Sequence, residues 1–277
     1  MFKLAVVGKD VSQSQSPRMH KFLFSRFGEA CSYETISIPP AEFSLRAEEL
    51  FSRFDAFNVT IPFKGAIIPF LKELRGDAQT FGAVNTVLSK RREGYNTDGF
   101  GFLLMLENEG IAVKGKSVLV LGAGGAGRSC IKKLLEAGGE VFVYERDTER
   151  LYEVYREFGA FTPLEEIPLR PYDIIINCTG VGMHDTVGKT PSAAFSGGVT
   201  EPVGRAILSQ CGVAVDLIYI PACSEFLKIA QKEGKPIVNG EAMLFYQAYM
   251  ADCIILGKQP DAMQAKGFYL SYREGIK

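Results

Sequence analysis

Histidine is scarce in this chain, and its cysteines do not fall in metal-binding or redox spacings. Only His20 and His184 occur among the 277 residues, so a histidine-rich metal site is not expected. No C-x-x-C pair occurs, and several cysteines stand in apolar runs, which favours reduced core thiols. The six are Cys31, Cys130, Cys178, Cys211, Cys223 and Cys253. We therefore predict a cytoplasmic protein with no bound metal.

Long apolar runs and blocks of like charge are absent as well. No apolar stretch reaches about 18 residues, so no transmembrane helix is expected. The first ten residues, MFKLAVVGKD, are too short and too soon charged for a secretory signal. The net charge is −1 without a basic stripe, which argues against nucleic acid or an anionic membrane as a partner. A monomer and a homodimer both stay open.

What remains is an ordinary globular composition, with 47% apolar and 23% charged residues, in a chain long enough for two domains. In the first hundred residues, short apolar runs alternate with helical patterns, which predicts a parallel or mixed α/β sheet. The predicted strands cover 3–8, 33–38, 54–61, 83–90 and 93–99, and the predicted helices cover 16–28, 41–50 and 98–110.

A second series of alternating strands and helices begins at residue 116 and continues through two apolar runs at 173–178 and 213–219. Gly180 to Gly212 has weak periodicity and is predicted to be one long loop. The segment 239–257 predicts a strong amphipathic helix, and another helix is expected after Pro260. The predicted domains are 1–100 with 240–277, and 101–239, so the last helices are expected to pack on the first domain.

A glycine-rich turn, GAGGAG (122–127), follows the apolar run SVLVL and precedes a helical pattern. It matches G-x-G-x-x-G, in which the first glycine permits a tight turn and the second lets a pyrophosphate approach the backbone. The third lets helix and strand pack closely. An acidic residue is expected about 20 residues later, and Glu145 ends the next apolar run. This context predicts a dinucleotide site.

Two questions about the ligand stay open at this turn. GAGGAGRS differs by one residue from the P-loop pattern G-x-x-x-x-G-K-[ST], with Arg128 in place of the lysine that reaches the β- and γ-phosphates. The choice of dinucleotide is also undecided. Glu145 could hydrogen-bond the ribose 2′-hydroxyl of NAD, whereas Arg146 could pair with the 2′-phosphate of NADP.

Four polar patches end apolar runs in the first domain: SQSQSP (12–17), NVTIPFK (58–64), AVNT (83–86) and NTDG (96–99). Ligands of open α/β sheets bind at the carboxyl ends of strands, so we expect the patches to converge. Their hydroxyls, amides, ammonium and carboxylate suit a small polyhydroxylated anion. Taken singly, each polar residue could equally serve a loop, a turn or a helix cap. Residues with this second interpretation are Ser14, Ser16, Asn85, Asn96 and Asp98.

Lys64 stands in an unusual place within NVTIPFK. It follows Pro62 by two residues, where the end of a strand is predicted to meet the start of a helix. A helix start carries partial positive charge, so a lysine is unfavourable there unless it has an anionic partner.

Seven motifs occur in an order that resembles the shikimate dehydrogenase family, which includes quinate/shikimate dehydrogenases. They are SQSQSP, NVTIPFK, AVNT, NTDG, GAGGAG, DLIY (216–219) and GEAMLFYQ (240–247), and the resemblance covers most of the chain. NVTIPFK together with AVNT and NTDG is highly specific, whereas the glycine turn alone adds little.

The resemblance implies an N-terminal α/β substrate-binding domain, a C-terminal Rossmann (doubly wound) dinucleotide-binding domain and a cleft between them. It also implies reversible hydride transfer between NADPH and 3-dehydroshikimate, giving shikimate, within chorismate and aromatic amino acid biosynthesis. Lys64 and Asp98 would form the catalytic pair. The residues that would hold the substrate are Ser14, Ser16, Thr60, Asn85, Tyr219 and Gln247. Those that would line the cofactor are Gly122, Ala123, Gly124, Gly125, Ala126, Glu145, Arg146, Arg150, Leu217 and Gly240.

The chemistry fits these residue types. As hydride reaches a ketone carbon, the oxygen becomes an alkoxide, which a lysine ammonium can stabilise and protonate. A neighbouring carboxylate can orient the lysine. The hydride belongs to the cofactor, and no metal is required.

This sequence departs from the family pattern at the end of the second Rossmann strand. Many members have Asn-Arg-Thr or Asn-Arg-Ser there, whereas this chain has Glu145-Arg146-Asp147, whose two acids should repel a 2′-phosphate. Both NADP and NAD therefore stay open. Quinate or another shikimate-like hydroxy acid is an alternative substrate. A non-catalytic dinucleotide- or ligand-binding relative is a further alternative, although such a protein would not require the Lys64/Asp98 pair.

Overall fold

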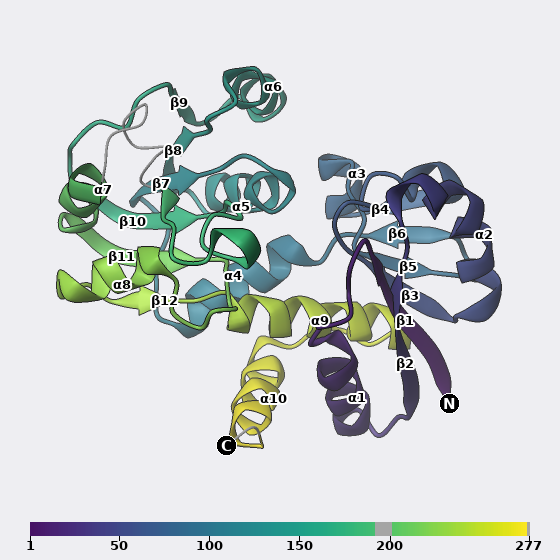
Figure 1. Cartoon of the computed structure of the whole chain (residues 1–277). Helices are drawn as coiled ribbons and strands as arrows, with labels where there is room; N and C mark the ends of the chain where they lie inside the picture. The colour runs from purple at the N-terminus through teal and green to yellow at the C-terminus, as the bar shows by residue number, and fades with distance from the viewer. Residues whose placement is uncertain (192–200, 276–277) are drawn as a thin grey trace. The chain divides into compact units, whose positions relative to one another are not determined.

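The computed structural model describes residues 1–191 and 201–275 and divides into two compact units (Figure 1). Unit 1 comprises Met1–Leu104 and Leu244–Lys277, and unit 2 comprises Met105–Met243. Each junction lies four residues after the boundary predicted from sequence, at 104 rather than 100 and at 243 rather than 239. No helix in the described ranges is long and apolar enough to cross a bilayer.

Unit 1 contains a mixed six-stranded sheet with the order β2-β1-β3-β5-β6-β4. Its parallel pairs are β1 with β2, β1 with β3, and β4 with β6, whereas β5 runs antiparallel to both of its neighbours. This agrees with the predicted mixed α/β sheet. The strands are β1 (Phe2–Gly8), β2 (Cys31–Ser37), β3 (Ala56–Val59), β4 (Glu73–Arg75), β5 (Thr86–Leu88) and β6 (Glu93–Tyr95).

The helices of unit 1 bury apolar side chains against both faces of this sheet. On β1, Leu4 and Val6 join a cluster with residues of α1 and α9, whereas Ala5 and Val7 join a cluster with residues of α2. This alternation is the period of two expected of a strand that is buried on both faces. The helices are α1 (Ser16–Arg26), η1 (Pro40–Glu42), α2 (Phe43–Arg53), η2 (Ile68–Phe70), α3 (Asp77–Phe81), α4 (Asp98–Asn108), α9 (Glu241–Leu256) and α10 (Ala262–Glu274).

One helix of unit 1 differs from its predicted character. No residue of α9 is exposed, and its hydrophobic side chains lie all round the helix, so the prediction of a strongly amphipathic helix is wrong. Apolar and aromatic residues that satisfy a helical period on one face also occupy the opposite face. The helix is therefore an interior element, and its few polar side chains, such as Gln247 and Asp252, lie among packed neighbours.

Unit 2 contains a six-stranded sheet in which every neighbouring pair is parallel, with the order β12-β11-β10-β7-β8-β9. Numbered from its own first strand, this is the order 6-5-4-1-2-3 of the doubly wound fold, whose switch point lies between β7 and β10. The strands are β7 (Ser117–Leu121), β8 (Glu140–Tyr144), β9 (Thr162–Leu164), β10 (Tyr172–Asn177), β11 (Cys211–Asp216) and β12 (Ile237–Val238).

Helices cover this sheet as well. Leu119 and Leu121 of β7 pack in one cluster with residues of α7 and α8. The segment 180–212 is not one long loop as predicted, because η3 and α7 form within it, and its residues 192–200 lie outside the described residues. The helices are α5 (Gly125–Glu136), α6 (Thr148–Phe158), η3 (His184–Thr186), α7 (Glu201–Leu208) and α8 (Glu225–Lys232).

Candidate functional site

Lys64 lies in a run of turns rather than at the start of a helix. After β3 the chain forms turns through residue 67, so the prediction that Lys64 opens a helix is wrong. The preceding Phe63 is buried and stacks on Phe43 with ring centroids 4.1 Å apart. The Lys64 carbonyl accepts a hydrogen bond of 2.8 Å from the Val84 amide. The backbone is thus anchored on both sides of a side chain that remains partly exposed.

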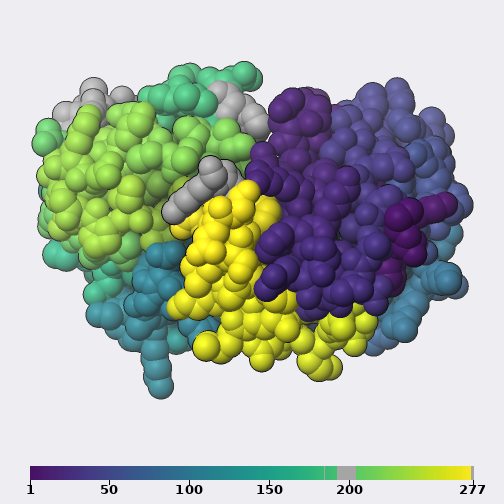
Figure 2. Space-filling model, turned by 90° about the horizontal axis from the view of Figure 1, so that it is seen from below, coloured from purple at the N-terminus to yellow at the C-terminus, as the bar shows by residue number. Residues whose placement is uncertain are grey.

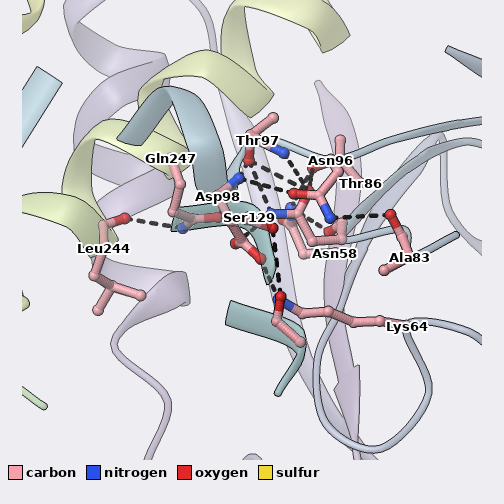
Figure 3. A network of polar contacts seen from close by, with 12 residues as sticks. Asn58, Lys64, Ala83, Thr86, Asn96, Thr97, Asp98, Ser129, Leu244 and Gln247 are labelled. Carbon is pink, nitrogen blue, oxygen red and sulfur yellow. Dashed lines mark hydrogen bonds and ion pairs between the residues drawn. The ribbon is translucent and has the colours of Figure 1, made fainter. Parts of the chain in front are cut away.

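Lys64 and Asp98 form an ion pair (Figure 3). Lys64 Nζ lies 2.6 Å from Asp98 Oδ2, and the two side chains are 23% and 10% exposed. Asp98 is the first residue of α4, where the positive end of the helix dipole favours a carboxylate. The Asp98 amide donates to Asn96 Oδ1 at 3.0 Å, which fixes the start of the helix. The pair is therefore held at both ends by secondary structure.

Asn85 forms a hydrogen bond with the second oxygen of the Asp98 carboxylate. Its Nδ2 donates to Asp98 Oδ1 at 2.8 Å, while its Oδ1 accepts from the Thr97 amide at 3.0 Å. Gln247 of α9 lies beside it, with Oε1 3.4 Å from Asn85 Nδ2 (Figure 3). The structure thus brings together four residues predicted from sequence, Lys64, Asn85, Asp98 and Gln247.

The other predicted substrate residues lie at the ends of neighbouring elements. Ser14 Oγ accepts from the Ser16 amide at 3.2 Å at the start of α1, and Thr60 directly follows β3. Helix α1 contacts both β1 and β2, and β3 pairs directly with β1. Tyr219 belongs to unit 2, three residues after β11, and burial raises the pKa of its hydroxyl.

Four residues in the hydrogen-bond network of unit 1 around Asn85 and Asp98 were not among the predicted site residues. Asn58, Thr86 and Thr97 belong to the polar motifs, and each hydrogen-bonds directly to Asn85 or its backbone. Their position inside NVTIPFK, AVNT and NTDG was a usable signal. Tyr33 gave none, because a tyrosine in an alternating strand pattern is indistinguishable from a core residue.

The glycine turn of unit 2 has the geometry that its spacing predicts. Gly122 has a φ of +98°, which a residue with a side chain rarely adopts. A Cβ on Gly127 would lie 2.2 Å from the carbonyl oxygen of Gly122, so only glycine lets α5 start this close to β7. A Cβ on Gly124 would meet no atom within 4 Å. The second glycine therefore faces open space above the N-terminus of α5, as a phosphate site requires.

Glu145 reaches back to this turn from the end of β8. Its Oε2 accepts from the Ala123 amide at 2.9 Å and its Oε1 accepts from the Asp147 amide at 3.1 Å. Asp147 caps α6 by accepting from the Arg150 amide at 3.2 Å. Arg150 lies 4.0 Å from Glu145 and 3.5 Å from Asp147, and Arg146 is exposed. One of the two acids at this strand end thus has a structural role in α6.

Gly240 packs against the backbone of Leu217. The Gly240 amide donates to the Ile218 carbonyl oxygen at 3.1 Å, and a Cβ on Gly240 would lie 2.0 Å from the Leu217 carbonyl oxygen. Beneath them, the buried Asp216 accepts from Asn177 Nδ2 and from the Ile218 amide, each at 3.0 Å. Burial raises the pKa of Asp216 to about 6, although these bonds and one from Ser224 favour its charged form. This network fixes the carboxyl ends of β10 and β11.

Arg128 does not occupy the role of a P-loop lysine. Its guanidinium forms an ion pair with Glu157 of α6. The parallel sheet order and the Glu145 contact accord with a dinucleotide site instead. Within the described residues, no group of three or more histidine, cysteine or acidic side chains could hold a metal ion.

Two family models match this chain. The model described as the shikimate dehydrogenase substrate binding domain matches residues 6–87, and the one described as shikimate / quinate 5-dehydrogenase matches residues 105–186. A shikimate dehydrogenase (NADP(+)) of Thermus thermophilus is 39% identical over 94% of this chain and 95% of its own. One from Carboxydothermus hydrogenoformans is 35% identical over 89% of this chain and 88% of its own.

Solved structures are similar over the same extent. A chorismate mutase/shikimate 5-dehydrogenase fusion protein from Clostridium acetobutylicum matches with a TM-score of 0.86 and 30% identity, covering 100% of this chain and 98% of that one. A Thermus thermophilus shikimate 5-dehydrogenase, solved in complex with NADP(H) and shikimate, matches with a TM-score of 0.83 and 34% identity, covering 98% and 100%. The chain belongs to the shikimate dehydrogenase family.

Proposed function

We propose that this enzyme reversibly reduces 3-dehydroshikimate to shikimate with a nicotinamide dinucleotide as hydride carrier. The observation that carries the proposal is the Lys64–Asp98 pair at 2.6 Å, set among Asn85, Thr97 and Gln247 in a chain of this family. A protein that only bound a dinucleotide or a ligand would not require this pair. Support for the substrate comes from the relatives, which are named shikimate dehydrogenases.

Lys64 acts as the proton donor in the direction of reduction. Its ammonium lies against the ketone oxygen and stabilises the negative charge that grows there as the carbon accepts hydride. The proton then passes from Nζ to that oxygen, leaving a hydroxyl and a neutral amine. Asp98 orients Nζ through the 2.6 Å contact, and the partial exposure of both side chains lets solvent restore the proton. In the direction of oxidation the same steps run backwards, with Lys64 as base.

The remaining polar residues bind the substrate. Asn85 and Gln247 lie beside the catalytic pair, so they suit the ring hydroxyl next to the reacting carbon. Hydroxyl groups at the start of α1 and after β3 suit the carboxylate and the other ring hydroxyl, since neutral donors bind an anion without needing a counter-charge. We assign substrate binding to Ser14, Ser16, Thr60, Asn85, Tyr219 and Gln247.

Unit 2 binds the cofactor, which when bound supplies or accepts the hydride. The open backbone at Gly124 and the amides at the start of α5 suit the pyrophosphate, and Glu145 marks the adenosine ribose. We propose NADP(H) as the cofactor because the relatives carry NADP(+) in their names. Arg146 and Arg150 suit its 2′-phosphate, whereas Glu145 opposes it, so discrimination against NAD(H) is weak.

The free cysteines also bear on the cellular compartment. None of the six cysteines forms a disulfide. Thiols persist in reducing compartments, so we place the enzyme in the cytoplasm.

Absorbance at 340 nm tests the proposal. Purified protein with shikimate and NADP⁺ should produce NADPH. Quinate belongs in the same assay, because one matching family model is described for both shikimate and quinate. Turnover of quinate alone would show that quinate, and not shikimate, is the substrate. No turnover of either acid with NADP⁺ or NAD⁺ would refute the proposed function.

A further inference from the structure

Tyr33 holds a fixed position inside unit 1, away from the Lys64–Asp98 pair. It lies in β2 and is only 6% exposed. Its ring stacks on His20 with centroids 4.6 Å apart and planes inclined by 14°. His20 Nδ1 lies 2.6 Å from Asp252 Oδ1 of α9, and both of these side chains are fully buried. The ring therefore has little freedom, and the position of its hydroxyl is determined.

The Tyr33 hydroxyl bonds a residue of the polar motifs. It donates to Asn58 Oδ1 at 2.7 Å. Burial and the nearby Asp252 raise the pKa of Tyr33 well above its ordinary value. The hydroxyl therefore stays protonated at neutral pH and donates to Asn58.

The Tyr33 hydroxyl and the Asn85 carbonyl favour the same orientation of the Asn58 amide. Asn58 Nδ2 donates to the Asn85 carbonyl and to Thr86 Oγ1, each at 3.1 Å. A flipped amide would place its oxygen against the Asn85 carbonyl, so two acceptors would meet without a proton between them. Tyr33 stabilises only the observed orientation, in which Asn58 Oδ1 accepts a hydrogen bond from its hydroxyl.

From Asn58 the hydrogen bonds continue in one direction to the catalytic pair. Thr86 Oγ1, which accepts from Asn58, donates to Asn85 Oδ1 at 3.0 Å. Asn85 Nδ2 donates in turn to Asp98 Oδ1 at 2.8 Å, opposite the oxygen that Lys64 contacts. Every member donates toward the Asp98 carboxylate, and bonds aligned in this way strengthen one another. Figure 3 shows Asn58, Thr86 and Asp98 within this network.

We propose that Tyr33 is a positioning residue for the reaction. Through Asn58 and Thr86 it orients Asn85 against Asp98. It therefore acts on the catalytic pair through Asn85 without touching substrate or cofactor itself. This inference rests on the proposed function, because it assigns a purpose to the geometry of that same site.

The variant Tyr33→Phe keeps the ring stack and removes only the hydroxyl. The kcat/KM for shikimate should fall about tenfold, in the range of one lost buried hydrogen bond that orients a catalytic group. The KM for the dinucleotide should stay unchanged, because unit 2 is not involved. Tyr249→Phe is the matched control, since its buried hydroxyl bonds Asp261 and Gln264 at the start of α10. Tyr249→Phe should lose about as much stability as Tyr33→Phe but keep the wild-type kcat/KM for shikimate.

A double-mutant cycle with Thr86→Val tests the path. If Tyr33 acts through Thr86, the double variant should lose little more kcat/KM than Thr86→Val alone. Additive losses, wild-type kcat/KM in Tyr33→Phe, or an equal activity loss in Tyr249→Phe would each overturn the proposal.

A crystal structure of Tyr33→Phe separates this inference from the proposed function. The Asn58 amide should be shifted or disordered and Asn85 displaced from Asp98. Unchanged positions of both amides overturn the inference whether or not the enzyme oxidises shikimate. If the wild-type protein oxidises neither acid, the proposed function fails, and the two amide positions still decide the role of Tyr33.

Discussion

The Lys64–Asp98 pair is only partly withdrawn from water, with 23% and 10% of the two side chains exposed. A fully buried pair would resist proton exchange with solvent, and a fully exposed one would be worth little as an orienting contact. The intermediate environment combines a short charge-assisted contact with a route for the proton. At the residue scale, the site therefore suits a group that must give up and regain a proton in each cycle.

Glu145 should set the discrimination between the two dinucleotides. Its carboxylate lies at the glycine turn, where a 2′-phosphate would add negative charge, so Glu145→Ser should raise the ratio of kcat/KM with NADP⁺ to kcat/KM with NAD⁺. We expect about a tenfold rise, which corresponds to about 1.4 kcal/mol. Arg146→Ala is the opposing control and should lower the ratio. Initial rates with both dinucleotides provide the measurement, and a ratio unaffected by either substitution would refute this assignment.

Asp216 should make stability depend on pH. Its folded-state pKa is raised from the ordinary 3.8 to about 6, so between these values the folded protein binds a proton that the unfolded chain releases. The contribution of Asp216 to the free energy of unfolding therefore falls as pH rises from 4 to above 6, by up to about 3 kcal/mol. Asp216→Asn lacks this dependence.

Urea unfolding of both proteins from pH 4 to pH 7 checks the effect of Asp216. The difference in unfolding free energy, wild type minus Asp216→Asn, should decrease across that range. Taking the difference removes other carboxylates such as Asp173, whose hydrogen bonds with Ser117 lower its pKa and give the opposite slope. Parallel pH profiles would show that Asp216 has no raised pKa.

At the scale of elements, the glycine turn combines two requirements that substitutions can separate. Gly127→Ala places a Cβ against the Gly122 backbone and should cost about 1–3 kcal/mol of stability. Gly124→Ala meets no protein atom, so it should change stability by less than about 0.5 kcal/mol. It should nevertheless raise the dinucleotide dissociation constant about tenfold or more, because its methyl group occupies the pyrophosphate position.

Thermal unfolding and calorimetric titration with NADP⁺ distinguish the two glycine variants. A Gly124→Ala protein that is stable and binds NADP⁺ normally would show that the pyrophosphate does not lie at this turn.

Elements were predictable where a periodic pattern and a sharp terminator coincided. The run SVLVL before GAGGAG became β7 as expected, and the alternating segment at 33–38 became β2. The end of β3 was misjudged, because the buried Phe63 and the Val84 bond hold Lys64 in turns, and neither contact has a local signature. Helix α7 was missed because Gly180 to Gly212 is rich in small residues that weaken the helical period.

At the scale of the whole molecule, the sequence predicted both sheets and the return of the chain to unit 1 at α9. Of the unit 1 network, Lys64, Asn85, Asp98 and Gln247 were predictable because each belongs to a specific motif. Tyr33 was not, because its role depends on which amide its hydroxyl meets across the sheet. Pairings of this kind arise from the register of β1, β2 and β3, which a single sequence does not specify.

Proton donation by Lys64 is the central claim of the proposed reaction, and it depends on the ion pair with Asp98. Initial rates of shikimate oxidation by wild-type enzyme and by Lys64→Ala test it most directly. The account predicts that kcat falls about 10³-fold while the KM for shikimate changes less than about tenfold, because the lysine acts chiefly in the transition state. Thermal unfolding of both proteins controls for misfolding. A folded Lys64→Ala enzyme with normal kcat and a raised KM would contradict the account.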